Sequence, residues 1–476
     1  MSLPETYKLL PKDKIYLDRE DVDVFFNDES LSLGSSIKRV ISFCDFDDKL
    51  CLLHGDTLIT SIPSQEDCLG ISKTDDEYTW KIESSSFDND IVWCGYFSFS
   101  NVNLLKKSLN ESGDDFLKAV SIYSEEKPLN RVYISKWYDF GHINTYFRNR
   151  SKHTSARDFN HLNVSNGIVW KTSISQKKIN AEFEWFRNLP DTLKIFTPQL
   201  IKYTKNDNSS NNLIYGLEYL PLPPLNEIFV HGLKPTYFWT KVFRCFDVFF
   251  ECCRKEFISN SDLMRLREDS SRLIAEKTWR RLDEFISNSL YPGIDVKTQV
   301  NQKDLPSLRD IVSNCIKLLD NVPIIPGVLH GDFCLSNILF DSRSDRIKVI
   351  DPRGLRADDS TSLIGDLRYD YAKLSHSIIG LYDHILSGAF DLDIFWSDDV
   401  CKFNFAIHVD ENILAIQKVF QNHLLPGGIL VKDIMPLTVL LFLSMLPLHA
   451  DNRTKQNALL ANAIHIYSSI YEKGYS

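Results

Sequence analysis

The segment of residues 328–354 holds the side chains with the most evident chemical capacity. Asp332 is followed five positions later by Asn337, and Asp351 follows the apolar run 347–350. A carboxylate near an acceptor hydroxyl can orient it and take its proton, whereas an amide oxygen and a second carboxylate can hold Mg²⁺ against nucleotide phosphates. A loop followed by a β-hairpin would bring the three groups together locally. This spacing predicts a site for phosphoryl transfer.

The same residues carry a resemblance to a known family. The sequence HGD at 330–332, Asn337 and the Ile-Asp pair ending at Asp351 resemble the catalytic and metal loops of the aminoglycoside phosphotransferase and choline kinase superfamily. That family is a small-molecule branch of the protein-kinase-like fold. The resemblance implies that Asp332 is the catalytic base, that Asn337 and Asp351 are metal ligands, and that His330 braces the loop. A solvated turn beside a strand is the alternative, which the combined spacing disfavours.

A strand and a helix upstream supply a second pair of charges. Residues 166–171 read as a turn and a short strand ending in Lys171, and residues 178–186 have the apolar spacing of an amphipathic helix. Lys171 resembles the lysine that pairs with nucleotide phosphates in this family, and Glu182 resembles the glutamate that orients it. Glu184, on a different helical face, is the rival for that role.

The phosphate loop departs from the protein-kinase pattern, because no glycine-rich sequence precedes Lys171. The small-molecule branch tolerates this departure. The polar segment 151–160 has hydroxyl and basic side chains instead, and Ser155 or Arg157 could contact phosphate there.

The strand expected at residues 213–220 ends in a proline-rich segment. In the resembling family this strand leads into the hinge between two lobes. Backbone groups of Glu218, Tyr219 and Leu220 are therefore the expected contacts of the adenine. An ordinary core strand ended by prolines is compatible with the same role.

A segment downstream of Asp351 extends the resemblance. Residues 365–374 are similar to a stretch that opens a helix after the metal loop, where Asp366 is expected to brace the catalytic loop or to contact substrate. Arg353 could meet an anionic substrate or a surface acid, and the sequence does not separate the two. The rest of the C-terminal half reads as a helical lobe that shapes the acceptor pocket.

The first 150 residues show a different pattern. Residues 50–59 read as one fully buried parallel strand whose carboxyl end presents Asp56, and the sequence WYDFG at 137–141 carries Asp139. Together with a strand expected at 92–99, this order resembles part of a GT-A-type sugar-phosphate nucleotidyltransferase. Two such aspartates bind a metal together in that family, so these two form a candidate second site.

The glycine-rich opening of that second family is absent from residues 1–34, so the resemblance is to a truncated α/β domain. The remaining residues of this domain show no evident binding site for a nucleoside triphosphate. Three interpretations follow: a non-catalytic relic, a module that binds a sugar nucleotide, or a half-domain completed by another polypeptide. The non-catalytic interpretations are favoured over nucleotidyl transfer.

The composition fits a folded protein with more than one core. The chain has 476 residues, of which 43% are hydrophobic, and a net charge of −10 without a basic face, which argues against a nucleic-acid partner. Its 10 cysteines have no zinc spacing and no secretory signal is evident, so we expect reduced thiols in the cytoplasm. Residues 437–449 are apolar but too short for a membrane span, and we expect a core helix there.

These features predict three parts: a truncated nucleotidyltransferase-like α/β domain (1–150), and an α+β protein-kinase-like domain with an N-lobe (151–225) and a helical C-lobe carrying the catalytic loop (226–476). The expected activity is transfer of a phosphoryl group from ATP, with Mg²⁺, to a hydroxyl of a small polar acceptor such as a sugar. Residues 350–354 and 365–377 also resemble bacterial proteins of capsule biosynthesis, which implies a role in surface polysaccharide synthesis and a partner enzyme of that process.

Two other functions stay open at this point. A choline or ethanolamine kinase would need an aromatic cage for its cationic acceptor, and Trp279, Tyr382 and Trp396 are available for one. A non-catalytic scaffold that binds a sugar nucleotide is the other, although it leaves the joint presence of the phosphoryl-transfer residues unexplained.

Overall fold

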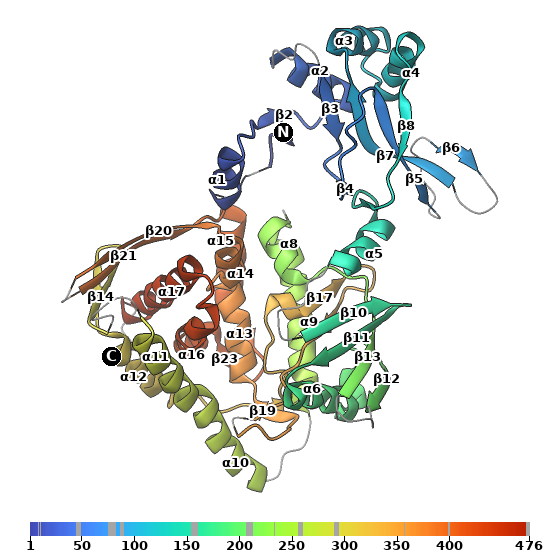
Figure 1. The fold of residues 1–476 in the computed structure, drawn as a ribbon. Coiled ribbons are helices and arrows are strands. Elements are labelled where there is room, and N and C mark those ends of the chain that lie inside the picture. Colours follow the sequence, from blue (N-terminus) through green and yellow to red (C-terminus); the bar gives the residue numbers. More distant parts are fainter. Residues whose placement is uncertain are drawn as a thin grey trace. The chain divides into compact units, whose positions relative to one another are not determined.

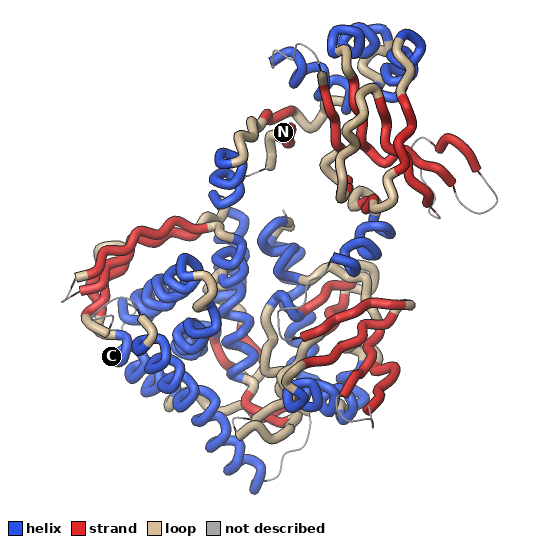
Figure 2. The backbone as a smooth tube through the Cα atoms, viewed as in Figure 1, coloured by secondary structure: helices blue, strands red, loops and turns tan. Residues whose placement is uncertain are grey.

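The computed structural model describes residues 1–476 except 8, 10, 44–48, 75–81, 86–89, 154–159, 206–212, 233, 256–259, 290–294, 357, 398–399 and 473–476. The chain divides into two compact units, Met1–Ser155 and Ala156–Ser476. The boundary predicted after residue 150 lies close to this division. Figures 1 and 2 show the helices and strands of both units.

Unit 1 is built on a mixed sheet with the strand order β3-β7-β5-β8, in which β6 also pairs with β7. The pair β5–β8 is parallel, and the other pairs are antiparallel. Aromatic residues of β7, among them Phe97 and Phe99, pack with Leu105 of α3 and Tyr123 of α4 into one buried cluster. The elements are β1 (Ser2–Pro4), α1 (Pro11–Arg19), β2 (Phe25–Asn27), α2 (Leu33–Phe43), β3 (Leu50–Leu53), β4 (Thr57–Ile59), β5 (Cys68–Thr74), β6 (Ile82–Ser85), β7 (Asp90–Phe99), α3 (Val102–Glu111), α4 (Phe116–Glu126), β8 (Asn130–Tyr133), β9 (Trp137–Asp139) and α5 (Ile143–His153).

The single parallel strand predicted for residues 50–59 is wrong. The segment forms two strands: β3 pairs antiparallel with β7, and β4 pairs antiparallel with β9. A turn divides them, in which the Thr57 N–H donates to the His54 carbonyl over 3.1 Å. Burial alternates along β3, as expected for an antiparallel strand with one solvated face, and the apolar composition of the run concealed this alternation.

Unit 2 begins with a four-stranded antiparallel sheet of order β10-β11-β13-β12. Asn166 and Gly167 form the two-residue turn between β10 and β11, with φ values of 52° and 72°. Both values lie in the left-handed region that this kind of hairpin turn requires and that Asn and Gly adopt most readily. Helix α6 packs against β11 and β13. The elements are β10 (Asn160–Ser165), β11 (Ile168–Ser173), α6 (Gln176–Asn188), α7 (Asp191–Lys194), β12 (Leu200–Lys205) and β13 (Leu213–Glu218).

Helices dominate the rest of unit 2 and share one large apolar core with α6 and β13. A second sheet, of order β15-β14-β21-β20, lies beside α17, and short two-stranded sheets carry the loops described below. The elements are α8 (Leu225–His231), α9 (Thr236–Arg254), α10 (Asn260–Ser271), a π-helical turn (Arg272–Glu276), α11 (Lys277–Ser287), β14 (Lys297–Val300), β15 (Lys303–Leu305), α12 (Leu308–Leu319), β16 (Pro326–Val328), a 3₁₀ turn (Leu335–Asn337), β17 (Ile338–Asp341), β18 (Arg346–Val349), β19 (Ile364–Asp366), α13 (Arg368–Ile378), α14 (Tyr382–Ser387), β20 (Phe390–Trp396), β21 (Val400–Ile407), α15 (Glu411–Gln421), β22 (Leu424–Leu425), β23 (Ile429–Leu430), α16 (Val431–Met445), a 3₁₀ turn (Leu446–His449) and α17 (Arg453–Glu472).

Helix α16 lies in the centre of this core. In the part of the chain that the structure describes, the helical segment Val431–His449 is the one long and apolar enough to cross a membrane by length and composition, and 72% of it is buried inside the unit. It packs against α13 and α17. Its apolar side chains therefore contact protein, as predicted for a core helix at residues 437–449.

Candidate active site

The site is built around two adjoining segments, which we call the HGD loop (residues 330–337) and the Asp351 hairpin (β17, β18 and Asp351). Strands β17 and β18 pair from Ile338↔Val349 to Asp341↔Arg346. The Ile350 N–H extends this ladder by donating to the Asn337 carbonyl over 3.0 Å. The hairpin thus places Asp351 next to Asn337, as the sequence spacing predicted.

Asn337 connects the loop to Asp332. Its Nδ2 donates to the Asp332 carbonyl over 2.9 Å and to the Asp332 Oδ2 over 3.0 Å. The amide thereby uses its donors on Asp332, and within the described residues its Oδ1 accepts no hydrogen bond. An amide oxygen beside a half-exposed carboxylate, that of Asp351, is the donor set that Mg²⁺ takes from a protein when nucleotide phosphates supply the remaining ligands. The residues present therefore fit this metal.

Lys171 on β11 joins the hairpin to helix α6. Its Nζ lies 2.5 Å from the Glu182 Oε1 and also contacts the Asp351 carboxylate. Burial alone would lower the pKa of Lys171, but the two carboxylates raise it above its ordinary value, so the ammonium stays charged. Glu184, the rival of Glu182, contacts Arg187 and Asn188 on the same helix instead.

The backbone after β18 adopts an uncommon conformation. Asp351 has φ +58°, in the left-handed region, and Gly354 has φ +63°. A Cβ on Gly354 would lie 2.2 Å from the Ala181 carbonyl oxygen, so only glycine lets this loop approach α6 so closely. The contact holds the hairpin end against the residue that precedes Glu182. Backbone strain of this kind persists where surrounding contacts fix it.

His330 is fully buried and supports the HGD loop, the role predicted for it. Its Nε2 donates to the Ile350 carbonyl over 3.0 Å, and the Trp185 Nε1 of α6 donates to the adjacent Leu329 carbonyl over 2.9 Å. Burial lowers the pKa of His330 to about 4. The imidazole is therefore neutral and ties the HGD loop to the Asp351 hairpin.

The acid that braces the HGD loop is Asp370 and not Asp366, which the sequence analysis put forward. The Asp370 carboxylate accepts the N–H groups of His330 and Gly331, each over 2.8 Å. Asp366 instead pairs with Arg368 at 2.8 Å and accepts from the Ser270 hydroxyl at 2.7 Å, so it joins α13 to α10. Helix α13 begins at Arg368, which puts Asp370 in its first turn.

Lys373 is a site residue to which sequence reasoning gave no role. Its Nζ lies 2.8 Å from the Asp332 Oδ1. Burial would raise the pKa of Asp332, but Lys373 opposes this and, with the hydrogen bond from Asn337, lowers it to about 2. The helical spacing of Asp370 and Lys373, three residues apart, places both on the face of α13 toward the HGD loop and was the available signal.

The segment after β13 runs beside the Asp351 hairpin. Pro224 forms an isolated bridge with Leu339 of β17, and the Phe340 N–H donates to the Pro223 carbonyl over 2.9 Å. The Tyr219 N–H donates to the Gly167 carbonyl over 2.8 Å, so it is already used. Contact of Glu218, Tyr219 and Leu220 with adenine stays a prediction.

Other predicted groups do not gather at this site. Ser155 and Arg157 lie outside the residues whose side chains the structure describes. The three aromatic side chains proposed for a cation cage have separate neighbours among those that the structure describes: the Tyr382 ring lies tilted against His376, Trp396 meets Phe403 edge to face, and Trp279 packs on the helical core.

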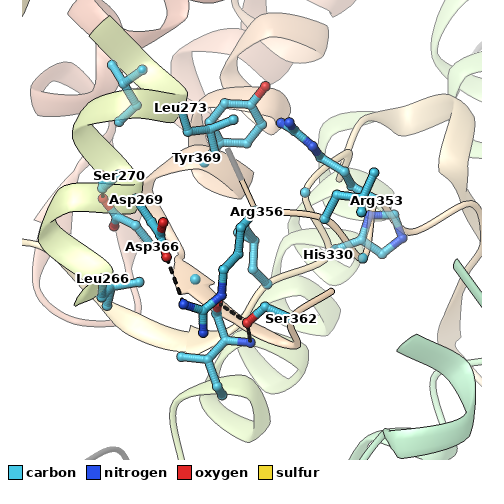
Figure 3. Close-up of a pocket in the computed structure, with 17 residues that line it drawn as sticks. Leu266, Asp269, Ser270, Leu273, His330, Arg353, Arg356, Ser362, Asp366 and Tyr369 are labelled. Carbon is cyan, nitrogen blue, oxygen red and sulfur yellow. Dashed lines mark hydrogen bonds and ion pairs between the residues drawn. The ribbon is translucent and has the colours of Figure 1, made fainter. Parts of the chain in front are cut away.

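A small cavity of about 30 Å³ adjoins the HGD loop. His330, Arg353, Arg356, Asp366 and Tyr369 contribute polar groups to its wall, and the side chains of Arg353 and Tyr369 point toward each other across it (Figure 3). The volume suits about one water molecule.

The second predicted pair, Asp56 and Asp139, lies in unit 1. Asp56 directly precedes β4, and Asp139 at the end of β9 pairs with Thr57 at the start of β4. Asp139 is buried and accepts hydrogen bonds from the Gly141 N–H at 2.9 Å and the Thr145 hydroxyl at 2.7 Å, and it contacts His142. These bonds secure the start of α5. No cluster of three or more His, Cys, Asp or Glu side chains suited to a metal occurs among the described residues.

Searches of protein-family models and of curated proteins found no match. Among solved structures, the chain is similar to an APH(2") enzyme in complex with GDP and kanamycin (14% identity, 68% of this chain and 93% of that chain, TM-score 0.40). It is also similar to a spectinomycin phosphotransferase with ADP and spectinomycin (11%, 67% and 92%, 0.35) and to an ethanolamine kinase of Plasmodium vivax (13%, 67% and 86%, 0.35). The chain is thus a mixed α/β protein with kinase-like neighbours over about two thirds of its length. Because these TM-scores are below 0.5, the interpretation of the site rests on its own geometry.

Proposed function

We propose that the chain is an ATP- and Mg²⁺-dependent kinase that phosphorylates a hydroxyl of a small polar acceptor. One observation carries this proposal: the charged contacts Asp332–Asn337 and Asp351–Lys171–Glu182 meet at the base of the Asp351 hairpin. Phosphoryl transfer needs an acceptor-orienting carboxylate, metal ligands and a phosphate-binding lysine in one place. A scaffold protein has no need of this combination.

In the proposed reaction, Asp332 orients the acceptor hydroxyl. A bond forms between the acceptor oxygen and the γ-phosphorus, the bond from that phosphorus to the β–γ bridging oxygen breaks, and the hydroxyl proton passes to the Asp332 carboxylate. Because the pKa of Asp332 is about 2, the carboxylate is a weak base and its main contribution is orientation. Asn337 and Asp351 would hold Mg²⁺, which neutralises charge on the phosphates when it is bound.

The acceptor is proposed to be a sugar or a sugar-like compound, and the process to be the synthesis of surface polysaccharide in the cytoplasm with a partner enzyme. The resemblance of residues 350–354 and 365–377 to capsule biosynthesis proteins supports this context. For unit 1 we propose a non-catalytic role, because Asp139 serves the local fold.

The test is ADP formation from ATP and Mg²⁺ with a panel of sugars, amino sugars, uronates, sugar phosphates, polyols and amino alcohols. Asp332→Asn is the blank, and Asp345→Asn is the matched control, because it makes the same exchange in the turn of the hairpin. We expect acceptor-dependent ADP formation in the wild type and the control but not in the blank. Failure of the wild type to bind ATP with Mg²⁺ would refute the proposed function.

A further inference from the structure

Three cations gather around one buried tyrosine of the site. Lys277 and Arg281 lie one turn apart on α11, and Arg353 follows the Asp351 hairpin; we call these three the cationic cluster. The Lys277 Nζ donates to the Tyr369 hydroxyl over 3.0 Å and lies 5.4 Å from the ring centroid. Arg281 donates to the Ser444 carbonyl over 2.9 Å, which fixes part of its guanidinium beside the same tyrosine.

The cluster adjoins Asp332. Tyr369 and Lys373 are four residues apart on α13, so they lie on the same face one turn apart, and Lys373 contacts Asp332. From the other side, the Arg353 N–H donates to the His330 carbonyl over 2.8 Å, and its side chain packs where a Cβ on Gly331 would lie. Figure 3 shows the Arg353 side chain directed toward Tyr369.

Within the described residues, the cluster has no carboxylate at ion-pair distance. The acids around it already have cationic partners: Asp332 with Lys373, Asp269 with Arg356, and Asp366 with Arg368. Exposed Glu284 on α11 acts on Arg281 only at longer range. Tyr369 can balance only one of the three charges. Partly buried cations without an anion are costly for a fold to keep, so this arrangement points to a further anion from outside the chain.

The pKa values of Lys277 and Tyr369 also indicate an excess of positive charge in the cluster. Burial lowers the pKa of Lys277 to about 8; Tyr369 opposes this effect, whereas neighbouring Arg353 and Arg281 add to it. Burial would raise the pKa of Tyr369, but Lys277, Lys373 and Arg353 lower it to about 7. Both directions reflect an excess of positive charge, which a bound anion would relieve.

We propose that the acceptor carries an anionic group, a carboxylate or a phosphate, which Lys277, Arg281 and Arg353 hold while its hydroxyl lies at Asp332. This inference rests on the proposed kinase function and names its substrate class. Arginine side chains bind both kinds of anion through paired N–H groups. Like-charge repulsion from the cluster would exclude cationic acceptors such as amino alcohols.

The test compares acceptors that differ only in charge: glucuronate and glucose 6-phosphate against glucose, with glucosamine as the cationic member. Two quantities are measured, kcat/KM for phosphoryl transfer and binding to protein saturated with a non-hydrolysable ATP analogue and Mg²⁺. We expect an anionic member to be favoured over glucose at least about 10-fold, and glucosamine to be the poorest. The ranking of glucuronate against glucose 6-phosphate separates carboxylate from phosphate.

Variants assign the effect to the cluster. We expect Lys277→Met, Arg281→Gln and Arg353→Gln each to lower kcat/KM for the anionic acceptor about 10- to 100-fold without changing the KM for ATP. Arg280→Gln is the matched control, because it removes the same charge from an exposed position of α11. Lys277→Arg keeps the positive charge and should retain most of the selectivity for anionic acceptors. This variant therefore distinguishes the effect of losing the charge from an effect on folding.

Equal kcat/KM and equal binding for the anionic acceptors and for glucose would overturn the proposal of an anionic acceptor. The same holds if neither kind of acceptor is phosphorylated or bound while ATP and Mg²⁺ still bind. Weaker nucleotide binding in the variants would assign the cluster to ATP and overturn it too. If the wild type binds no ATP with Mg²⁺, the proposed function itself fails, and the acceptor proposal fails with it.

Discussion

The two units contain aspartate pairs that look alike in sequence but have different partners. In unit 2, the Asp332 and Asp351 side chains keep 43% and 50% of their surface exposed and face the lysines Lys373 and Lys171. In unit 1, Asp139 is buried and receives N–H and O–H groups at the start of α5. A carboxylate that faces cations and solvent can exchange its partner for a ligand, whereas one that holds backbone N–H groups is part of the fold.

Among substitutions in the two aspartate pairs, Asp332→Asn is expected to have the largest effect on kcat. The neutral amide keeps the shape, but it orients the acceptor hydroxyl less strongly than the carboxylate and cannot take its proton, so we expect kcat to fall about 10²- to 10⁴-fold. Equilibrium binding of ATP with Mg²⁺ and the unfolding midpoint should stay as in the wild type. Turnover within a few fold of the wild type would remove Asp332 from the chemistry.

Asp351→Ala tests the metal-binding half of the pair. We expect the affinity for ATP in the presence of Mg²⁺ to fall at least about 10-fold. Loss of a group that only orients a metal ligand already costs about 10-fold in metal affinity, and loss of a direct ligand should cost at least as much. Affinity measured in EDTA should change far less. Calorimetric titration with and without Mg²⁺ checks this, and an equal loss in both conditions would argue against a metal site.

Lys373→Met tests how strongly a neighbouring cation lowers the pKa of Asp332. Without Lys373, the carboxylate loses its stabilising charge and burial dominates, so the pKa of Asp332 rises from about 2, by about one to three units. The acid limb of the kcat/KM profile should therefore move to higher pH. Lys177→Met, an exposed lysine of the same unit, should leave the profile unchanged. An unmoved acid limb in Lys373→Met would contradict the pairing.

Asp139→Ala should have the smallest catalytic effect and a structural one instead. Loss of its buried hydrogen bonds should lower the free energy of unfolding of unit 1 by about 1–3 kcal/mol, measured by denaturant titration, with kcat/KM unchanged. Asp56→Asn, at an exposed position, should change stability by less than about 0.5 kcal/mol. Loss of phosphoryl transfer in either variant would restore the second site as a candidate.

Local patterns predicted much of unit 2. The strand ending near Lys171, the helix carrying Glu182 and the hairpin before Asp351 each follow from apolar period and turn residues within a few positions. The resemblance pointed to Glu182 and the helical repeat put Glu184 on another face; in the structure Glu182 contacts Lys171, whereas Glu184 contacts Arg187.

What the sequence did not predict depends on contacts between distant segments. Asp366 and Asp370 are both acids near the start of α13, and only the packed loop shows which one receives the His330 N–H. In the same way, the apolar run 50–59 divides into two strands because β7 and β9 pair with different parts of it. Pairing of this kind is decided by tertiary structure and not by local propensity.

The contact between Lys171 and Asp351 has a consequence for the order in which ligands arrive. Free Mg²⁺ approaching Asp351 meets a carboxylate that the lysine already neutralises, so the metal alone should be a poor ligand. Nucleotide phosphates offer Lys171 another anion and would release the carboxylate at the moment the metal needs it. Under the proposed function, metal and nucleotide are therefore expected to bind as one complex, and the protein without nucleotide to bind little metal.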